Sequence, residues 1–322
     1  MASEQPRISV IDPIGPAIDR VKAMLFAPFD LVRWLVIGFC AWLANLGRGG
    51  LSGGFNFGFP GPGPRREIDF EGVRHHVESF FGVEMALIIM IGAFVFIVAV
   101  VVAILLLWLS SRGRFMFLHC VAQNKAEVKI PWRQYREQGN SLFLFRLAAG
   151  IIFFISVALF VVPILLLTGV IGRGAGLAGF GIIAVVIMLV LVLIPVGVIY
   201  SLILKFTNDF VVPIMYLRGS RCIEGWREYR RLLAANAGGF TLYILFQILI
   251  AMAISAIVAA FGFLTCCCGF FLLAIPYVGT VLMLPLPAFM RAYSLHYLAQ
   301  FGPPFNVFAQ AEPPAAPVPQ AP

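Results

Sequence analysis

Long stretches without charged residues constrain this chain more than any other feature of its sequence. No Asp, Glu, Lys or Arg lies between Arg231 and Arg291, a region that is divided by a turn at Thr265–Gly269. Three more charge-free runs precede it: Met85–Leu109, Leu147–Ile171 and Ala175–Leu204. A helix crosses a hydrocarbon core of ~30 Å with about 20 apolar residues. The runs therefore predict five membrane-spanning helices.

The composition excludes a soluble globular protein. The chain is 61% hydrophobic and 12% charged, whereas about a quarter of the residues in soluble domains are charged. The mean hydropathy of +0.96 also excludes disorder for nearly the whole chain, because disordered segments combine low hydrophobicity with high charge. The bilayer is therefore the expected solvent.

A sixth span is expected near the N-terminus. Trp34–Gly47 is charge-free but shorter than the other runs, and it crosses the bilayer if Arg33 and Arg48 reach opposite interfaces. The expected fold is all-α: a polytopic helical membrane protein with about six transmembrane helices and cytoplasmic amphipathic elbow helices. Its spans are predicted near residues 31–48, 85–109, 147–171, 175–204, 240–264 and 270–290.

The spans belong to a membrane domain at residues 31–302, with a Gly- and Phe-rich outer loop at 49–84. Residues 1–30 form a cytoplasmic lead, and the spacing of Ile14, Ile18 and Val21 predicts an interfacial helix there. The Pro- and Ala-rich tail at 303–322 is expected to be disordered.

The basic residues predict the orientation. Most of the 23 Lys and Arg residues lie at the N-terminus or within Arg112–Arg146 and Lys205–Arg231. Cytoplasmic loops carry an excess of such residues, so both termini are expected in the cytoplasm and the protein in the inner (cytoplasmic) membrane. The net charge of +8 favours anionic lipid at the cytoplasmic face and gives no argument for nucleic-acid binding.

One pentapeptide occurs twice. Trp132–Arg136 reads Trp-Arg-Gln-Tyr-Arg and Trp226–Arg230 reads Trp-Arg-Glu-Tyr-Arg, each between a span that enters the cytoplasm and one that leaves it. The matching positions predict an internal repeat of span, elbow helix and span. Trp and Tyr favour the headgroup level of a bilayer, and Arg binds phosphate. The predicted lipid-headgroup or interface residues are Trp132, Arg133, Tyr135, Arg136, Trp226, Arg227, Tyr229 and Arg230.

These eight residues allow two interpretations. They are either general interface anchors that set the orientation, or a specific site for anionic lipid or for a partner protein.

Two motif matches lack the structure that their chemistry needs. Gly174–Gly179 fits the dinucleotide-binding pattern, but it falls in the turn between two spans, and no acid occurs from Gln138 to Asn208. Gly50–Gly54 fits the nucleophile elbow of hydrolases, but a Gly- and Phe-rich loop offers no strand-to-helix turn. Neither a cofactor nor a serine nucleophile is expected.

Metal ligands are equally sparse. Glu71, His75 and Glu78 share the polar face of a short outer helix, which is expected to be solvated rather than to bind Zn²⁺. Three cysteines at an outer turn are expected to act as small apolar residues, with a redox or lipidated role left open: Cys266, Cys267 and Cys268. No metal site is predicted.

The predicted span cores contain no acid or histidine, the groups that mark ion-coupled transport and intramembrane chemistry. Asp209 lies at the cytoplasmic end of a span, where a salt bridge is its expected role. An enzyme is therefore not expected. Asp209, His119 and His296 are the candidates if folding brings them together.

The elbow repeat and the segment Arg291–Pro303 resemble a family of uncharacterised bacterial multi-pass membrane proteins, over most of the chain. The segment Asp209–Pro213, the elbow after it and the next span are distantly similar to the membrane domain attached to some glycerophosphodiester phosphodiesterases. This similarity implies a helical membrane module without the catalytic barrel. Neither resemblance implies a catalytic or binding residue.

Two functions follow from these features. The first is a non-catalytic membrane module that organises lipids or partner proteins through its cationic elbows. The alternative is a permease or facilitator for an apolar or amphiphilic solute, because the repeat and the proline-kinked spans are compatible with gating.

Overall fold

A computed structural model describes residues 8–27, 29–46, 83–171, 178–264 and 275–310. Within these ranges every regular element is a helix and no strand occurs, so the all-α prediction is confirmed for them. The helices are α1 (Ile14–Leu25), α2 (Leu31–Asn45), α4 (Val83–Gln123), α5 (Lys129–Gln134), α6 (Arg136–Ile171), α7 (Ala178–Phe206), the π-helix η1 (Thr207–Val211), α8 (Val212–Arg218), α9 (Cys222–Ala235), α10 (Ala237–Leu264), α12 (Pro276–Leu282), α13 (Pro285–Ala299), and the 3-10 helices η2 (Pro303–Phe305) and η3 (Phe308–Gln310).

Four helical segments are long and apolar enough to cross a membrane. They overlap the spans predicted near residues 85–109, 147–171, 175–204 and 240–264. The segments are Ile89–Gln123 in α4, Arg136–Ile164 in α6, Ile187–Arg218 from α7 into α8, and Ala237–Leu264 in α10.

The two remaining predicted spans have a different form. Helix α2 is apolar but has only 15 residues, about 22 Å at 1.5 Å per residue against a core of ~30 Å. Near residues 270–290 the described chain forms two helices, α12 and α13, which meet at Met283 and Leu284. The count of six spans therefore stays a prediction. The outer loop at 49–84, apart from its last two residues, lies outside the described part of the chain.

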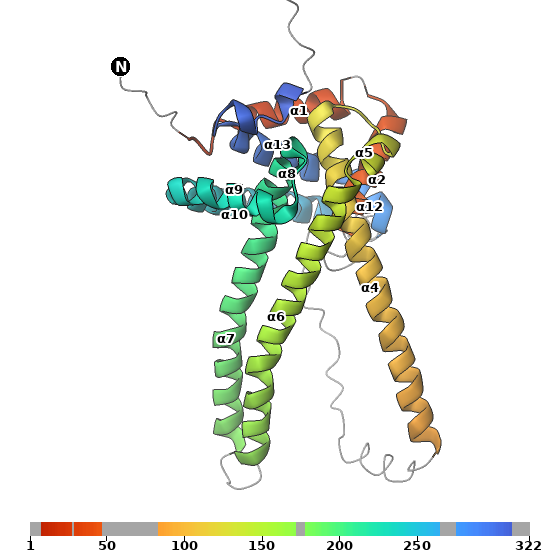
Figure 1. Ribbon diagram of the computed structural model, residues 1–322, viewed down its shortest axis with the longest axis vertical. Coiled ribbons are helices and arrows are strands. Elements are labelled where there is room, and N and C mark those ends of the chain that lie inside the picture. The colour runs from red at the N-terminus through yellow and green to blue at the C-terminus, as the bar shows by residue number, and fades with distance from the viewer. Residues whose placement is uncertain (1–7, 28, 47–82, 172–177, 265–274, 311–322) are drawn as a thin grey trace, which may run out of the picture.

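Figure 1 shows α4, α6 and α7 extending in the same general direction from the end of the molecule where α1, α8 and α13 gather. Their large apolar side chains point away from the protein: Phe96 is 69% exposed, Phe154 74% and Leu191 70%. A soluble monomer rarely exposes apolar surface on this scale. The faces of these helices are suited to lipid, which agrees with a membrane protein.

The core lies at the end where the shorter helices gather. There α2 packs along α4, and Gly113 of α4 makes the close approach possible. A Cβ atom at Gly113 would lie 2.6 Å from the backbone of Leu43 and Ala44. A side chain in that space would have to push one helix away from the other.

The two ends of the described chain also pack against this core. Helix α1 lies against α13, and Arg20 of α1 donates hydrogen bonds to the backbone carbonyls of Val121 and Ala122 at the end of α4. The first residues of the tail at 303–322 differ from the disorder predicted for it: Val307 is buried, and the ring of Phe308 stacks on His296 with centroids 4.2 Å apart. Apolar side chains among the prolines give this part of the tail a surface to bury.

Candidate functional site

The second copy of the pentapeptide lies within α9, whose inner face is attached to α6 and α8. The backbone N–H of Cys222 donates to Ser141 Oγ at 3.0 Å. Gly225 lets α9 approach the neighbouring helix, since a Cβ there would lie 3.1 Å from side-chain atoms of Met215 and Val211. One face of α9 is thus packed on the protein, and the other is available to solvent or lipid.

The available face of α9 carries positive charge that the helix itself does not neutralise. Glu224 caps the helix start by accepting from a backbone N–H at 3.2 Å, and Glu228 pairs with Arg218 at 3.0 Å. Arg227 and Arg230 are exposed. Neither guanidinium has a hydrogen bond or an ion pair with a residue that the structure describes. Both are free to bind an anion.

The first copy has the same burial pattern on a different backbone. It begins in α5, passes through Tyr135 between the helices, and ends at Arg136, the first residue of α6. In both copies the Trp is half-buried, the Tyr is buried and the two Arg are exposed.

The two tyrosines pack inside the protein and not at a lipid-facing surface. Tyr135 stacks on Phe115 with centroids 5.9 Å apart and planes 12° apart. Tyr229 is fully buried and stacks on Phe210 at 5.3 Å and 7°. Each pair joins an elbow to the end of the preceding long helix. The four arginines of the two copies remain exposed.

Trp132 of the first copy is covered by a charged side chain of the protein itself. Its ring meets Trp108 edge to face, with centroids 6.1 Å apart. The guanidinium of Arg112 lies 4.3 Å from the Trp108 centroid and 5.0 Å from the Trp132 centroid. Both distances are typical of cation–π contacts. An internal cation thus occupies the space next to the first Trp.

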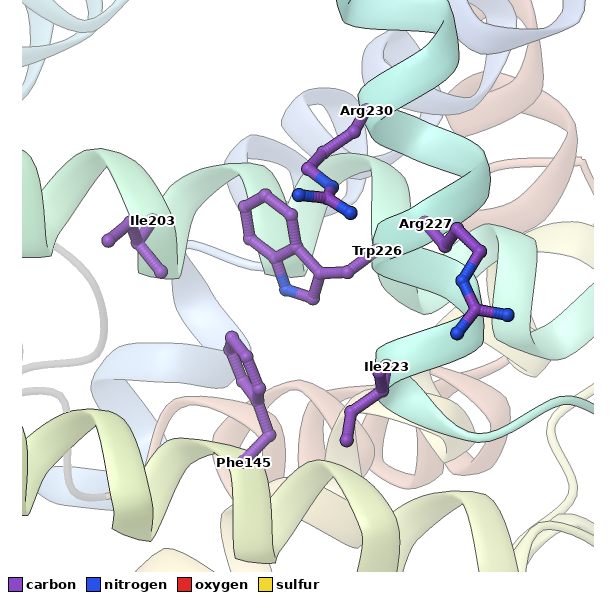
Figure 2. Close-up of a pocket in the computed structure, with 6 residues that line it drawn as sticks. All are labelled: Phe145, Ile203, Ile223, Trp226, Arg227 and Arg230. Carbon is purple, nitrogen blue, oxygen red and sulfur yellow. The ribbon is translucent and has the colours of Figure 1, made fainter.

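Trp226 of the second copy borders an open pocket instead. Its indole N–H donates to Thr207 Oγ1 at 3.2 Å, which fixes the ring against the first residue of the π-helix. Beside the ring lies a pocket of about 420 Å³ between α6, α7 and α9, here called the α9 pocket (Figure 2). Its lining residues are Phe145, Ile203, Ile223, Trp226, Arg227 and Arg230.

The α9 pocket has an apolar interior and a cationic edge. The Phe145 and Trp226 rings lie against each other, with centroids 5.9 Å apart. Figure 2 shows Ile203 to one side of the indole ring and the Arg230 guanidinium beside it. Phe145 directly precedes Arg146, and Ile203 lies two residues before Lys205; these two charged residues bound two apolar runs. These charges mark the expected boundary between hydrocarbon and headgroups. At this expected boundary an amphiphile would change from tail to headgroup beside the pocket.

A second group of polar residues is largely hydrogen-bonded within the protein. The π-helix η1 places Asp209 against Lys205 at 3.1 Å and against the Tyr243 hydroxyl, which donates to the carboxylate at 3.3 Å. Gln247 on α10 donates to the same hydroxyl at 2.5 Å and accepts from Lys205. Arg291 of α13 donates to a backbone carbonyl of η1 at 2.5 Å. These bonds join α7, α10 and α13, and this is a structural role.

The enzyme candidates lie in three different surroundings. His119 Nδ1 is 3.0 Å from the Tyr216 hydroxyl, His296 stacks on Phe308, and Asp209 pairs with Lys205. Among the described residues no group of three or more His, Cys, Asp or Glu side chains could hold a metal ion. Four other sequence features fall wholly or partly outside the described part: Gly50–Gly54, the set Glu71, His75 and Glu78, the first four residues of Gly174–Gly179, and Cys266 to Cys268.

Phe145 and Ile203 are the site residues that the sequence did not reveal. Both are ordinary apolar residues close to a charge at the end of a long run: Phe145 is separated from the run Leu147–Ile171 by Arg146, and Ile203 is the second-last residue before Lys205. Their place beside the interfacial charges is the signal that could have identified them. Their contact with α9 depends on the tertiary fold.

The four long apolar helices indicate a multi-helical membrane protein. Residues 8–286 match the family model DUF7544, described as a family of unknown function, and the chain belongs to this family. No curated protein and no solved structure matches the chain. A relation to the glycerophosphodiester phosphodiesterases is thus not shown.

Proposed function

We propose that this protein is a non-catalytic membrane module that gathers anionic lipid at its two cationic elbows. The exposure of Arg133, Arg136, Arg227 and Arg230, with the Tyr of each copy packed inward, carries the proposal. Guanidinium groups bind phosphate through two parallel hydrogen bonds. A basic residue near an anionic membrane surface contributes about 1 kcal/mol of binding.

The location of the elbows supports this function. Helix α5 follows α4 and leads into α6, and α9 follows α8 and leads into α10. Each elbow thus lies between candidate spans and next to the expected cytoplasmic boundary. Both would meet the same leaflet, so that the four arginines act on one lipid surface.

The lipids retained by the purified protein test the proposal. Wild type, extracted gently from a membrane of known composition, is expected to retain a higher anionic share than the bulk bilayer. Changing all four arginines to Gln is expected to return that share to the bulk value, since the charge-assisted contacts are lost. Lipid mass spectrometry gives both shares.

A charge-matched control separates site from net charge. The variant with Lys22, Lys125, Lys129 and Arg221 changed to Gln loses four positive charges outside the two pentapeptides, and it should keep most of the enrichment. If the pentapeptide variant retains as much anionic lipid as wild type, the proposed function is wrong.

A further inference from the structure

The two elbows differ in what occupies the space beside the Trp. In the first, the Arg112 guanidinium lies over Trp108 and Trp132 and donates to Asn140 Oδ1 at 3.1 Å. In the second, the α9 pocket lies beside Trp226. Both Trp rings have an aromatic partner, since Trp226 lies 5.9 Å from Phe145 between ring centroids. The first elbow contains its own cation beside the Trp, whereas the second leaves Arg227 and Arg230 open to a ligand.

We propose that the α9 pocket binds one anionic phospholipid, with its phosphate between Arg227 and Arg230 and an acyl chain against Phe145, Ile203 and Trp226. This inference rests on the proposed function and names the substrate class of one elbow. The first elbow contributes general attraction only, since Arg112 already fills it.

Charge complementarity selects the headgroup. Arg227 and Arg230 are three positions apart on one helix, so they are neighbours on its surface. The acids of α9 are engaged by the helix start and by Arg218. With Glu228 paired, α9 carries three arginines against the single carboxylate of Glu224, so the helix keeps a net positive charge that attracts an anion.

Size and surroundings select a lipid over free phosphate. A volume of about 420 Å³ falls within the range of roughly 300–1,000 Å³ that is usual for small-molecule sites. Four of the six lining residues are apolar or aromatic, which would gain nothing from phosphate alone. Outside the pocket, the apolar surface continues along α7 at Ile199, which is 59% exposed. An acyl chain can continue along this surface into the bilayer.

Native mass spectrometry of the full-length protein, titrated with phosphatidylglycerol, tests this site. Wild type is expected to retain one tightly bound phosphatidylglycerol, and phosphatidylethanolamine or glycerol phosphate is not expected to displace it. Arg227→Gln with Arg230→Gln should weaken this binding by about tenfold or more, because two charge-assisted contacts are lost. Arg133→Gln with Arg136→Gln should retain the lipid.

A second variant tests the pocket without changing charge. Ile203→Trp fills the apolar interior and should abolish the bound lipid, whereas Ile194→Trp, on an exposed face of the same helix, should not. The inference is overturned if Ile203→Trp binds like wild type, if the two arginine pairs have equal effects, or if glycerol phosphate competes as well as the lipid. Anionic enrichment without one retained lipid rejects the pocket alone. If wild type shows no enrichment of anionic lipid, the proposed function is rejected as well.

Discussion

At the scale of single residues, Tyr229 is held by its ring and not by its hydroxyl. The side chain is fully buried against Phe210, and its hydroxyl has no partner among the described residues. Burial, followed by the nearby carboxylate of Asp209, raises the pKa of Tyr229, so it stays neutral. Tyr229→Phe should leave the thermal unfolding midpoint in detergent unchanged or higher. Tyr229→Ala should lower the midpoint, because loss of the buried ring reduces the free energy of unfolding by about 3–5 kcal/mol. Equal losses in both variants would contradict this account.

His296 should make stability depend on pH. Burial, and then the positive charge of Arg20, lower the pKa of His296 to about 4, whereas the unfolded side chain titrates near 6.5 (about the model-peptide value). As the pH falls, the unfolded state therefore takes up the proton before the folded state does. The stabilisation of the fold by neutral His296 is complete above about pH 6.5 and is lost as the pH falls toward about 4. Between about pH 7.5 and about pH 5, the thermal unfolding midpoint should fall less in His296→Phe than in wild type. An identical fall of the midpoint in both proteins would show that His296 does not cause the pH dependence.

At the scale of helices, the contact of α2 with α4 depends on Gly113. Gly113→Ala places a methyl group 2.6 Å from the backbone of α2, which cannot move aside as a side chain can. The expected cost is about 1–3 kcal/mol, the usual range for overpacking. Gly92→Ala is the control in the same helix, because nothing lies within 4 Å of its Cβ position. Thermal unfolding in detergent compares the two. Equal midpoints would show that α2 and α4 are not packed this closely.

Helices were predictable from the sequence where a charge-free run is long. The runs at Met85–Leu109 and Leu147–Ile171 exceed the length needed to cross a bilayer, and length alone identifies them. Residues 31–48 are near the minimum, so composition does not decide between a span and a shorter packed helix. The break at Met283 and Leu284 follows from prolines whose effect depends on neighbouring helices.

The exposed residues of the site were predictable from the sequence, but its buried contacts were not. The arginines of each pentapeptide are exposed, as charged residues of an elbow should be. Tyr135 and Tyr229 were placed at the headgroups, since Tyr suits both an interface and a core. Their burial in the core depends on ring contacts with Phe115 and Phe210, which lie about 20 residues earlier in the chain. The α9 pocket needs three helices together, which no local pattern encodes.

At the scale of the whole molecule, the fold predicts that the loops before α5 and before α9 face the same side of the membrane. The long helices α4, α6 and α7 extend from the same end of the protein (Figure 1). Single cysteines at Lys125 and at Arg221, in a chain without its native cysteines, should both react with an impermeant reagent from the cytoplasm only. Labelling from opposite sides would contradict this arrangement.

Binding of anionic lipid at the elbows can be measured in the native membrane. A photoactivatable phosphatidylglycerol can be cross-linked there and the adducts mapped by peptide mass spectrometry. We expect adducts concentrated on α9 and around Phe145 and Ile203, at the expected cytoplasmic boundary of α6 and α7. Adducts spread evenly along the lipid-exposed faces of α4, α6 and α7, without concentration at α9, would contradict this expectation.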